Sequence, residues 1–293
     1  MSLTGFINFL KPPGMTSHDV ISSLRRLFNE KKIGHMGTLD PGASGVLPIA
    51  VGSATKIIQY IPEKSKSYRA EMVLGLVSNT GDLFGTVSSF PVPEIPSLES
   101  LSEVIKNFVG IIEQKPPMAS AVKVGGRKLY EYFRNGMEVD IPKRKVDIFN
   151  IKVIDYNYPK LIIDVKCSPG TYIRTLCQDI GNVVNCGAVL SFLVRLESGG
   201  FRIDESLTYE EIKSLYERGE NFFISAYDML SDYPFVKLDS DLQDKVIHGN
   251  CFSFESGLND NSIIRLLNEK GEFIAIGRCF HGKIQPEKVF VKL

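Results

Sequence analysis

The sequence predicts one large and one small unit whose helices and strands are compatible with an α+β fold, and three observations indicate this organisation. A chain of 293 residues is long for a single domain and fits a large domain plus a small one. Hydrophobic residues make up 43% of it, enough to fill a sizeable core. Segments with helical spacing alternate with short strands over residues 1–232, whereas residues 233–293 predict short strands joined by turns.

The first third of the chain alternates between strands and helices. Thr16 and Asp19 resemble a capping box, with Asp19 in place of the usual Glu, and apolar residues at helical spacing follow them. Pro62 ends a second, shorter helical pattern. We therefore expect a strand, a helix, a strand, a short helix and a strand over residues 6–10, 17–29, 46–51, 54–61 and 67–76.

The middle of the chain predicts a β-hairpin between helices. Gly110 closes an amphipathic helix, and Asn157-Tyr158-Pro159 supplies a turn between two strands. A later helix starts at Thr208 with acidic residues in its first turn, where negative charge is favourable. The expected order is a helix, two hairpin strands, a helix, a strand and a helix, over residues 98–108, 146–155, 161–166, 171–184, 187–196 and 208–218.

A basic, turn-rich excursion at residues 114–145 interrupts this pattern. Its first part, residues 114–123, is strand-like, Gly125-Gly126 turns the chain, and residues 128–135 are helix-like before Lys143-Arg144-Lys145. Such an excursion between core strands predicts an arm that grips a partner. A solvated hairpin fits the same pattern.

Charge is unevenly distributed along a chain whose net charge is zero. Residues 1–70 contain nine Lys/Arg against four Asp/Glu, and residues 121–174 contain eleven against six. Residues 201–260 contain five against thirteen. A neutral protein can thus present a basic face to phosphates, although random clustering on solvated surfaces gives the same pattern.

Composition argues against several protein classes. No apolar run reaches the roughly 18 residues that a membrane-spanning helix needs, and the N-terminus lacks the pattern of a secretion signal. The five cysteines form no C-x-x-C pair, which favours a reducing cytoplasm over a disulfide framework. Four scattered histidines do not suggest a metal cluster. We expect a cytoplasmic protein.

The segment from Gly34 to Gly45 is the most informative part of the chain. It places the carboxylate of Asp40 among four glycines, between a helical segment and an apolar strand. Glycine lets backbone pass close to a ligand, and Pro41 biases Asp40 toward an extended conformation. The segment predicts a rigid loop that presents one acid. An ordinary Asp-Pro-Gly turn is the alternative.

Three segments together resemble the TruB family of tRNA pseudouridine synthases. Residues 34–41 resemble its catalytic motif, Lys66-Ser67-Tyr68-Arg69 resembles its tyrosine motif, and residues 170–175 resemble its arginine motif. Further segments match in the same order, namely residues 11–17, 116–123 and 193–196. The likeness covers about residues 5–230, and the C-terminal segment resembles a shortened PUA domain, a small RNA-binding barrel.

The resemblance implies a fold, an activity and a partner. It implies a pseudouridine synthase fold, with a mixed, mostly antiparallel central sheet, flanking helices and the site in a cleft across the sheet. The implied activity isomerises uridine-55 in the T-loop of tRNA by breaking the N-glycosidic bond and rejoining the base through C5. No metal, nucleotide or redox cofactor is implied. The implied partner is the T-arm of tRNA; no protein or membrane partner is implied, and we expect a monomer.

The resemblance also assigns three catalytic residues. Asp40 matches the essential aspartate, which can act as a nucleophile on the sugar or on the uracil ring, and the sequence leaves both routes open. Arg174 matches the arginine that pairs with it. Tyr68 matches the tyrosine that stacks on a uracil taken out of its stack.

Four further residues are implied to bind RNA. Tyr172 matches a second tyrosine of the pocket, and Leu193 matches an apolar wall. His35 matches a histidine that fills the gap left by the extruded base. Lys11, in a loop near a helix start, suits a phosphate contact.

Other functions remain open from the sequence. A pair of carboxylates in the manner of a glycosidase is the rival interpretation of Asp40, but no second acid stands in a comparable loop. A helper that folds tRNA through the arm and the C-terminal module needs no chemistry. A synthase acting on another RNA shares every catalytic residue.

Overall fold

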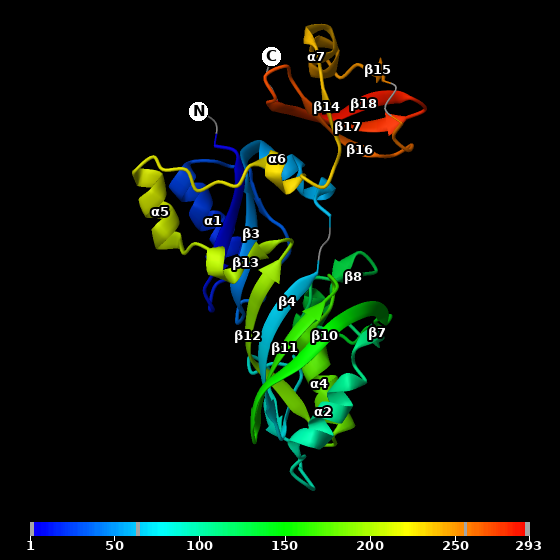
Figure 1. Cartoon of the computed structure of the whole chain (residues 1–293). Helices are drawn as coiled ribbons and strands as arrows, with labels where there is room; N and C mark the ends of the chain where they lie inside the picture. Colours follow the sequence, from blue (N-terminus) through cyan, green and yellow to red (C-terminus); the bar gives the residue numbers. More distant parts are fainter. Residues whose placement is uncertain (1–2, 63–64, 255–256, 291–293) are drawn as a thin grey trace.

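The computed structural model describes residues 3–62, 65–254 and 257–290, and a nine-stranded sheet forms its large unit (Figure 1). The main strand order is β1-β3-β12-β4-β11-β10-β7, with β2 beside β3 and β13 beside β12. Only β12 and β3 run parallel among the described pairs of this sheet, so the expected mixed, mostly antiparallel sheet is confirmed. The strands are β1 (Gly5–Lys11), β2 (Ile33–His35), β3 (Ser44–Val51), β4 (Lys66–Leu74), β7 (Gly110–Gln114), β10 (Arg144–Asn157), β11 (Lys160–Cys167), β12 (Ala188–Ser198) and β13 (Phe201–Arg202).

Helices pack on the apolar face of this sheet. Along β4, Tyr68, Ala70 and Met72 are buried, while Arg69 and Glu71 alternate with them on the other face. The buried set joins one core with apolar residues of the helices. The expected capping box is confirmed, because Thr16 accepts from Asp19 N and Asp19 accepts from Thr16 N. The helices of this core are α1 (Ser17–Phe28), α2 (Leu98–Lys106), α4 (Ile173–Val183) and α5 (Tyr209–Glu217).

Short elements connect the main ones. The helix expected at residues 54–61 is a pair of 3₁₀ turns. The strand expected at residues 114–123 is wrong, because β7 ends at Gln114 and two prolines, which lack an N–H, follow shortly after it. Part of the arm forms a small hairpin and a six-residue helix. These elements are η1 (Gly52–Lys56), η2 (Ile58–Tyr60), β5 (Leu76–Ser78), β6 (Val87–Ser89), β8 (Lys123–Val124), β9 (Arg127–Lys128), α3 (Leu129–Arg134), η3 (Ile203–Glu205) and α6 (Ala226–Met229).

A second, five-stranded sheet forms the C-terminal module, with the order β14-β16-β17-β18-β15. Its strands confirm a small β module of the PUA type, to which helix α7 adds an element that the sequence did not predict. Asp239 caps α7 by accepting from Leu242 N at 2.8 Å. The elements are β14 (Phe235–Lys237), α7 (Ser240–Ile247), β15 (Phe252–Ser253), β16 (Ile263–Leu267), β17 (Phe273–Phe280) and β18 (Lys283–Val289).

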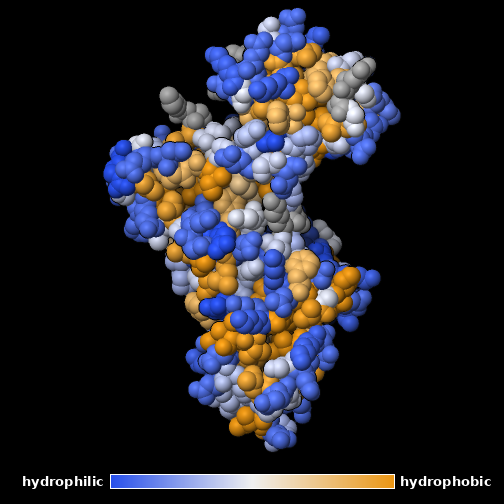
Figure 2. Space-filling model, in the orientation of Figure 1, coloured by the Kyte–Doolittle hydropathy of each residue, from blue (hydrophilic) through white to orange (hydrophobic). Residues whose placement is uncertain are grey.

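The module packs on the large unit through a shared apolar cluster. Phe6 of β1, Leu230 and Ile276 of β17 are buried in this cluster. Arg265 of β16 lies with its guanidinium 4.4 Å from the centre of the Tyr227 ring, a cation–π contact. On one side of the molecule, a hollow lies between the C-terminal module and the large unit (Figure 2).

Candidate active site

The loop that carries Asp40 joins β2 to β3. Ala43 N donates to the Asp40 carbonyl oxygen at 3.1 Å, so the Asp-Pro-Gly turn does form. Ser17, in the first turn of α1, exchanges two hydrogen bonds with the backbone of Leu39 at 2.9 and 3.0 Å. Gly45 has a φ of +107°, and a Cβ there would lie 2.3 Å from the Arg195 carbonyl oxygen. Glycine is therefore required where this loop enters β3 beside β12.

Two buried cations bind the backbone of the loop. Lys11 is completely buried, and its Nζ donates to three carbonyl oxygens, including that of Pro41 at 3.3 Å. Arg195, also completely buried in β12, donates to the carbonyl oxygens of Gly37 and Thr38, both at 3.2 Å. Because charged donors make the stronger hydrogen bonds, these contacts fix the loop on both sides of Asp40.

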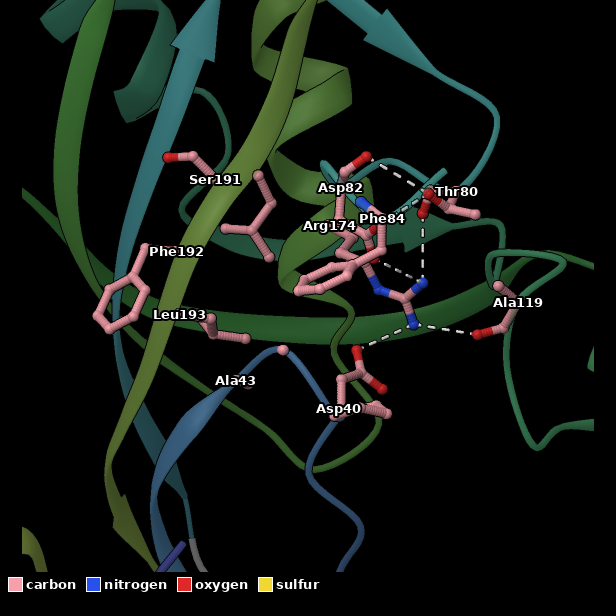
Figure 3. Close-up of a pocket in the computed structure, with 13 residues that line it drawn as sticks. Asp40, Ala43, Thr80, Asp82, Phe84, Ala119, Arg174, Ser191, Phe192 and Leu193 are labelled. Carbon is pink, nitrogen blue, oxygen red and sulfur yellow. Dashed lines mark hydrogen bonds and ion pairs between the residues drawn. The ribbon is translucent and has the colours of Figure 1, made fainter. Parts of the chain in front are cut away.

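A third cation, Arg174 of α4, pairs with the acid itself (Figure 3). Its Nη2 lies 3.0 Å from Oδ2 of Asp40 and donates to the Ala119 carbonyl oxygen at 3.1 Å. Its Nη1 donates to the Thr80 carbonyl oxygen at 3.2 Å and lies 3.5 Å from Oδ2 of Asp82. The Arg174 side chain is only 5% exposed, whereas that of Asp40 is 45% exposed. The guanidinium thus holds a carboxylate that remains open to a ligand.

A small cavity brings five of the predicted site residues together. Asp40, Tyr68, Tyr172, Arg174 and Leu193 all line this space of about 90 Å³. Asp40 lies in the loop, Tyr68 in β4 and Leu193 in β12. Tyr172 directly precedes α4, and Arg174 lies in its first turn. The sequence separates them widely, so only the fold places one acid, one guanidinium and two phenols around one cavity.

The two tyrosines are held differently. Tyr68 is 8% exposed, and burial raises the pKa of its phenol, which therefore keeps its proton at neutral pH. The nearby charge of Arg195 opposes this increase. The backbone of Tyr172 is bracketed by the buried amide of Gln114, which accepts from Tyr172 N at 3.0 Å and donates to its carbonyl at 3.3 Å. The start of α4 is thereby joined to the base of the arm.

His35 lies on the other side of the loop, away from the cavity of Asp40. It ends β2 and lines a separate space of about 210 Å³ with Gly37 and Lys66. Burial, reinforced by the charge of Arg195, lowers the pKa of His35, so that its ring is neutral at pH 7. Its Nδ1 is buried without a hydrogen-bond partner among the described residues.

The expectation for Lys11 needs correction. Its ammonium group is fully buried and its three donors are directed at carbonyl oxygens, so it does not present a charge to a phosphate. The sequence placed it in a loop beside a helix start, whereas Lys11 is the last residue of β1 and pairs with Gly45 of β3. The sequence also gave no sign of its burial. In the structure Lys11 fixes the loop of Asp40.

Two charged residues of the site escaped the sequence interpretation. Asp82 shares Arg174 with Asp40 and lines a neighbouring cavity with it, so the statement that no second acid stands in a comparable loop is wrong. Arg195 belongs to a segment that the family resemblance included, but only Leu193 was singled out there. A charged residue inside an apolar strand was the signal that could have identified Arg195.

No helix among the described residues combines the length and the apolar character needed to cross a membrane. In the same ranges, no cluster of three or more His, Cys, Asp or Glu side chains is arranged to hold a metal ion.

Family models cover most of the chain in three parts. "TruB family pseudouridylate synthase (N terminal domain)" matches residues 25–173, and "tRNA pseudouridylate synthase B C-terminal domain" matches residues 174–230. "Pseudouridine synthase II TruB, C-terminal" matches residues 234–290.

Whole proteins agree with this assignment. The chain is 44% identical over 296 residues to the tRNA pseudouridine synthase B of Caldanaerobacter subterraneus subsp. tengcongensis, covering 99% of this chain and 100% of that protein. It is 45% identical to that of Alkaliphilus oremlandii, over 85% and 82% of the two chains. A solved structure described as a Cbf5-Nop10-Gar1 complex contains a similar chain, with a TM-score of 0.73, 27% identity, and coverage of 98% of this chain and 85% of that one. The chain belongs to the TruB family of pseudouridylate synthases.

Proposed function

We infer that this chain is a tRNA pseudouridine synthase that isomerises uridine-55 in the T-loop of tRNA. Full-length relatives with more than 40% identity carry the name tRNA pseudouridine synthase B. The observation that carries the inference is the Asp40–Arg174 pair inside a cavity that Tyr68 also lines. An acid beside aromatic rings is what the cleavage of a nucleoside bond and the retention of the free base require.

The reaction is an isomerisation, so its atoms balance without a co-reactant. The bond from N1 of uracil to C1′ breaks, a bond from C5 to C1′ forms, C5 loses its proton and N1 gains one. The proposal covers two routes, in which Asp40 attacks either C1′ of the sugar or C6 of the base. Arg174 orients one carboxylate oxygen through the 3.0 Å contact, while the Asp40 side chain stays 45% exposed.

The walls of the cavity retain the base while the bond is open. We assign Tyr68 as the stacking face, with Tyr172 and Leu193 as further walls. Burial raises the pKa of Tyr68 further above neutral, so its hydroxyl keeps its proton and can donate a hydrogen bond. His35, neutral and outside this cavity, suits stacking in the gap that the extruded uridine leaves in the RNA.

Basic side chains of the arm suit the phosphates of the T-arm. Lys123, Arg127, Arg134 and residues 143–145 are all exposed. Phosphate contacts position an RNA without reading its sequence. We propose that residues 1–232 form the catalytic unit, that residues 233–293 form a PUA-like RNA-binding unit, and that the enzyme works as a cytoplasmic monomer.

The test is the formation of pseudouridine in an unmodified tRNA transcript, mapped by carbodiimide labelling. An isolated T-arm stem-loop should be modified at the T-loop uridine, while a ribosomal RNA fragment should not. Binding of the transcript without any new pseudouridine in the T-loop would refute the proposed reaction. A tRNA-folding helper role is tested in the same system: tRNA maturation should persist in cells that carry Asp40→Asn if the protein also acts without chemistry.

A further inference from the structure

One apolar cluster contains both a wall of the His35 cavity and part of the C-terminal module. The wall consists of Met36, Ile58 and Ile61, which line the cavity with His35. Ile61 is buried in the cluster, and Met36 and Ile58 pack against it. From the module, Ile276 of β17 is buried in the same cluster. Because close-packed side chains transmit displacements, the position of the module bears on this His35 wall.

A series of hydrogen bonds joins the module to the same wall. Tyr233, in the segment that leads into the module, donates from its hydroxyl to the Tyr60 carbonyl oxygen at 2.7 Å. Tyr60 ends η2, the 3₁₀ turn that begins with Ile58. The Tyr233 carbonyl oxygen in turn accepts from Nε of Arg265, in β16 of the module, at 2.9 Å. Tyr233 therefore connects the module to a turn that supplies part of the His35 wall.

Arg265 is a buried cation at the junction of the two units. It is only 6% exposed, and its guanidinium lies 4.4 Å from the centre of the Tyr227 ring and 5.8 Å from that of Phe235. Its Nη1 also donates to the Tyr227 carbonyl oxygen at 3.5 Å, so it reaches α6, which lies between the module and the large sheet (Figure 1). Removal of a buried charged donor leaves its acceptors unpaired. Arg265 is thus placed to set the orientation of the module on the large unit.

We propose that Tyr233 and Arg265 are positioning residues for His35, because they hold the module against η2 and so keep the His35 wall in the form that binds the T-loop. The inference rests on the proposed function, in which His35 fills the gap left by the extruded uridine. It gives the module a role besides contact with RNA. A surface that is already in place loses less free energy to ordering when RNA binds, so the contribution falls on affinity rather than on the chemical step.

A double-mutant cycle with His35 tests the inference. Steady-state kinetics on a T-arm stem-loop are measured for Arg265→Met, for His35→Ala and for the double variant. Arg265→Met should raise KM about tenfold (about 1.4 kcal/mol) and leave kcat within about twofold. In the His35→Ala background the same replacement should have no further effect on KM, because the ring that the module positions is absent.

A second variant keeps the test decisive if Arg265→Met does not fold. Tyr233→Phe removes only the hydroxyl and should raise KM about threefold, again without effect in the His35→Ala background. Tyr156→Phe is the matched control, since the Tyr156 hydroxyl also donates to a carbonyl oxygen at 2.7 Å, that of Pro96, but joins β10 to the segment before α2. This control should leave KM unchanged.

Hydrogen exchange in the RNA-free enzyme gives an independent readout. The Met36 amide donates to the Pro48 carbonyl oxygen at 2.9 Å, so its exchange reports on the His35 wall. Exchange at Met36 should be faster in Arg265→Met and Tyr233→Phe than in the unchanged enzyme, and should not change in Tyr156→Phe.

Three results would overturn the inference. The first is an unchanged KM in both Arg265→Met and Tyr233→Phe, and the second is an unchanged rate of exchange at Met36 in both variants. The third is a KM loss that persists in full in the His35→Ala background, which would show that the module acts on the RNA without His35. Inactivity of the unchanged enzyme on the T-arm stem-loop would instead contradict the proposed function.

Discussion

Replacement of Arg174 by Met tests the central contact of the site. Methionine keeps a long side chain in a position that is 4% exposed but removes the guanidinium and its four polar contacts. Asp40 then loses the charge 3.0 Å from its Oδ2. Coulomb energies for two unit charges 4 Å apart are about 1 kcal/mol in water and about 4 kcal/mol near a protein surface. Because Asp40 is about half exposed, we take about 3 kcal/mol as the energy of its interaction with Arg174. Loss of this energy predicts a roughly 100-fold slower isomerisation.

The Arg174→Met variant should also be less stable than the unchanged protein, although the loss should be smaller than for an isolated buried ion pair. Removal of one partner of a buried ion pair costs about 3–5 kcal/mol. Here Asp82 keeps its hydrogen bonds from Thr80 and Phe84, and Asp40 is solvated. We therefore expect a loss of about 2 kcal/mol in the free energy of unfolding, measured by urea denaturation.

Arg69→Met is the matched control. Arg69 forms a two-point pair with Asp164, with both contacts at 2.8 Å, but its side chain is 48% exposed on the opposite face of β4 from Tyr68. Such a surface pair contributes at most about 1 kcal/mol, and its loss should not change the rate. Single-turnover rates on a T-arm substrate, with the affinity measured separately, give the comparison. If Arg174→Met is no slower than Arg69→Met at equal RNA occupancy, the orienting role of Arg174 is refuted.

Three further outcomes are expected. Asp40→Asn should abolish pseudouridine formation and leave T-arm affinity within about twofold, because the amide keeps the shape of the side chain; residual turnover would contradict a nucleophilic role. Burial lowers the pKa of Lys11 from 10.5 to about 8, so between these pH values the unfolded chain binds more protons than the native protein and stability rises with pH. The free energy of unfolding in urea, measured relative to that of Lys11→Met, should therefore increase by about 3 kcal/mol from pH 8 to 10.5. A stability difference between the two proteins that stays constant or falls over this range would refute the argument. Affinity for tRNA should fall as salt rises, with a shallower slope after neutral replacement of residues 143–145, and an unchanged slope would exclude the arm from phosphate binding.

The sequence by itself determined most of the elements. The capping box at Thr16 and Asp19 and the hairpin of β10 and β11 formed as expected, because caps, turns and apolar spacing act between near neighbours. It also determined which loop carries the acid, since glycines and Pro41 restrict that loop locally.

The tertiary structure decided what surrounds the acid. The sequence predicts a phosphate contact for Lys11, yet the packing of β1 against the loop buries its ammonium group among carbonyl oxygens. Asp82, which the sequence interpretation did not single out, becomes the second partner of Arg174 once α4 packs beside its turn. Contacts of this kind join segments that are distant in the chain. The register of β12 against β3 and β4 and the packing of α4 determine them, so local sequence patterns cannot specify them.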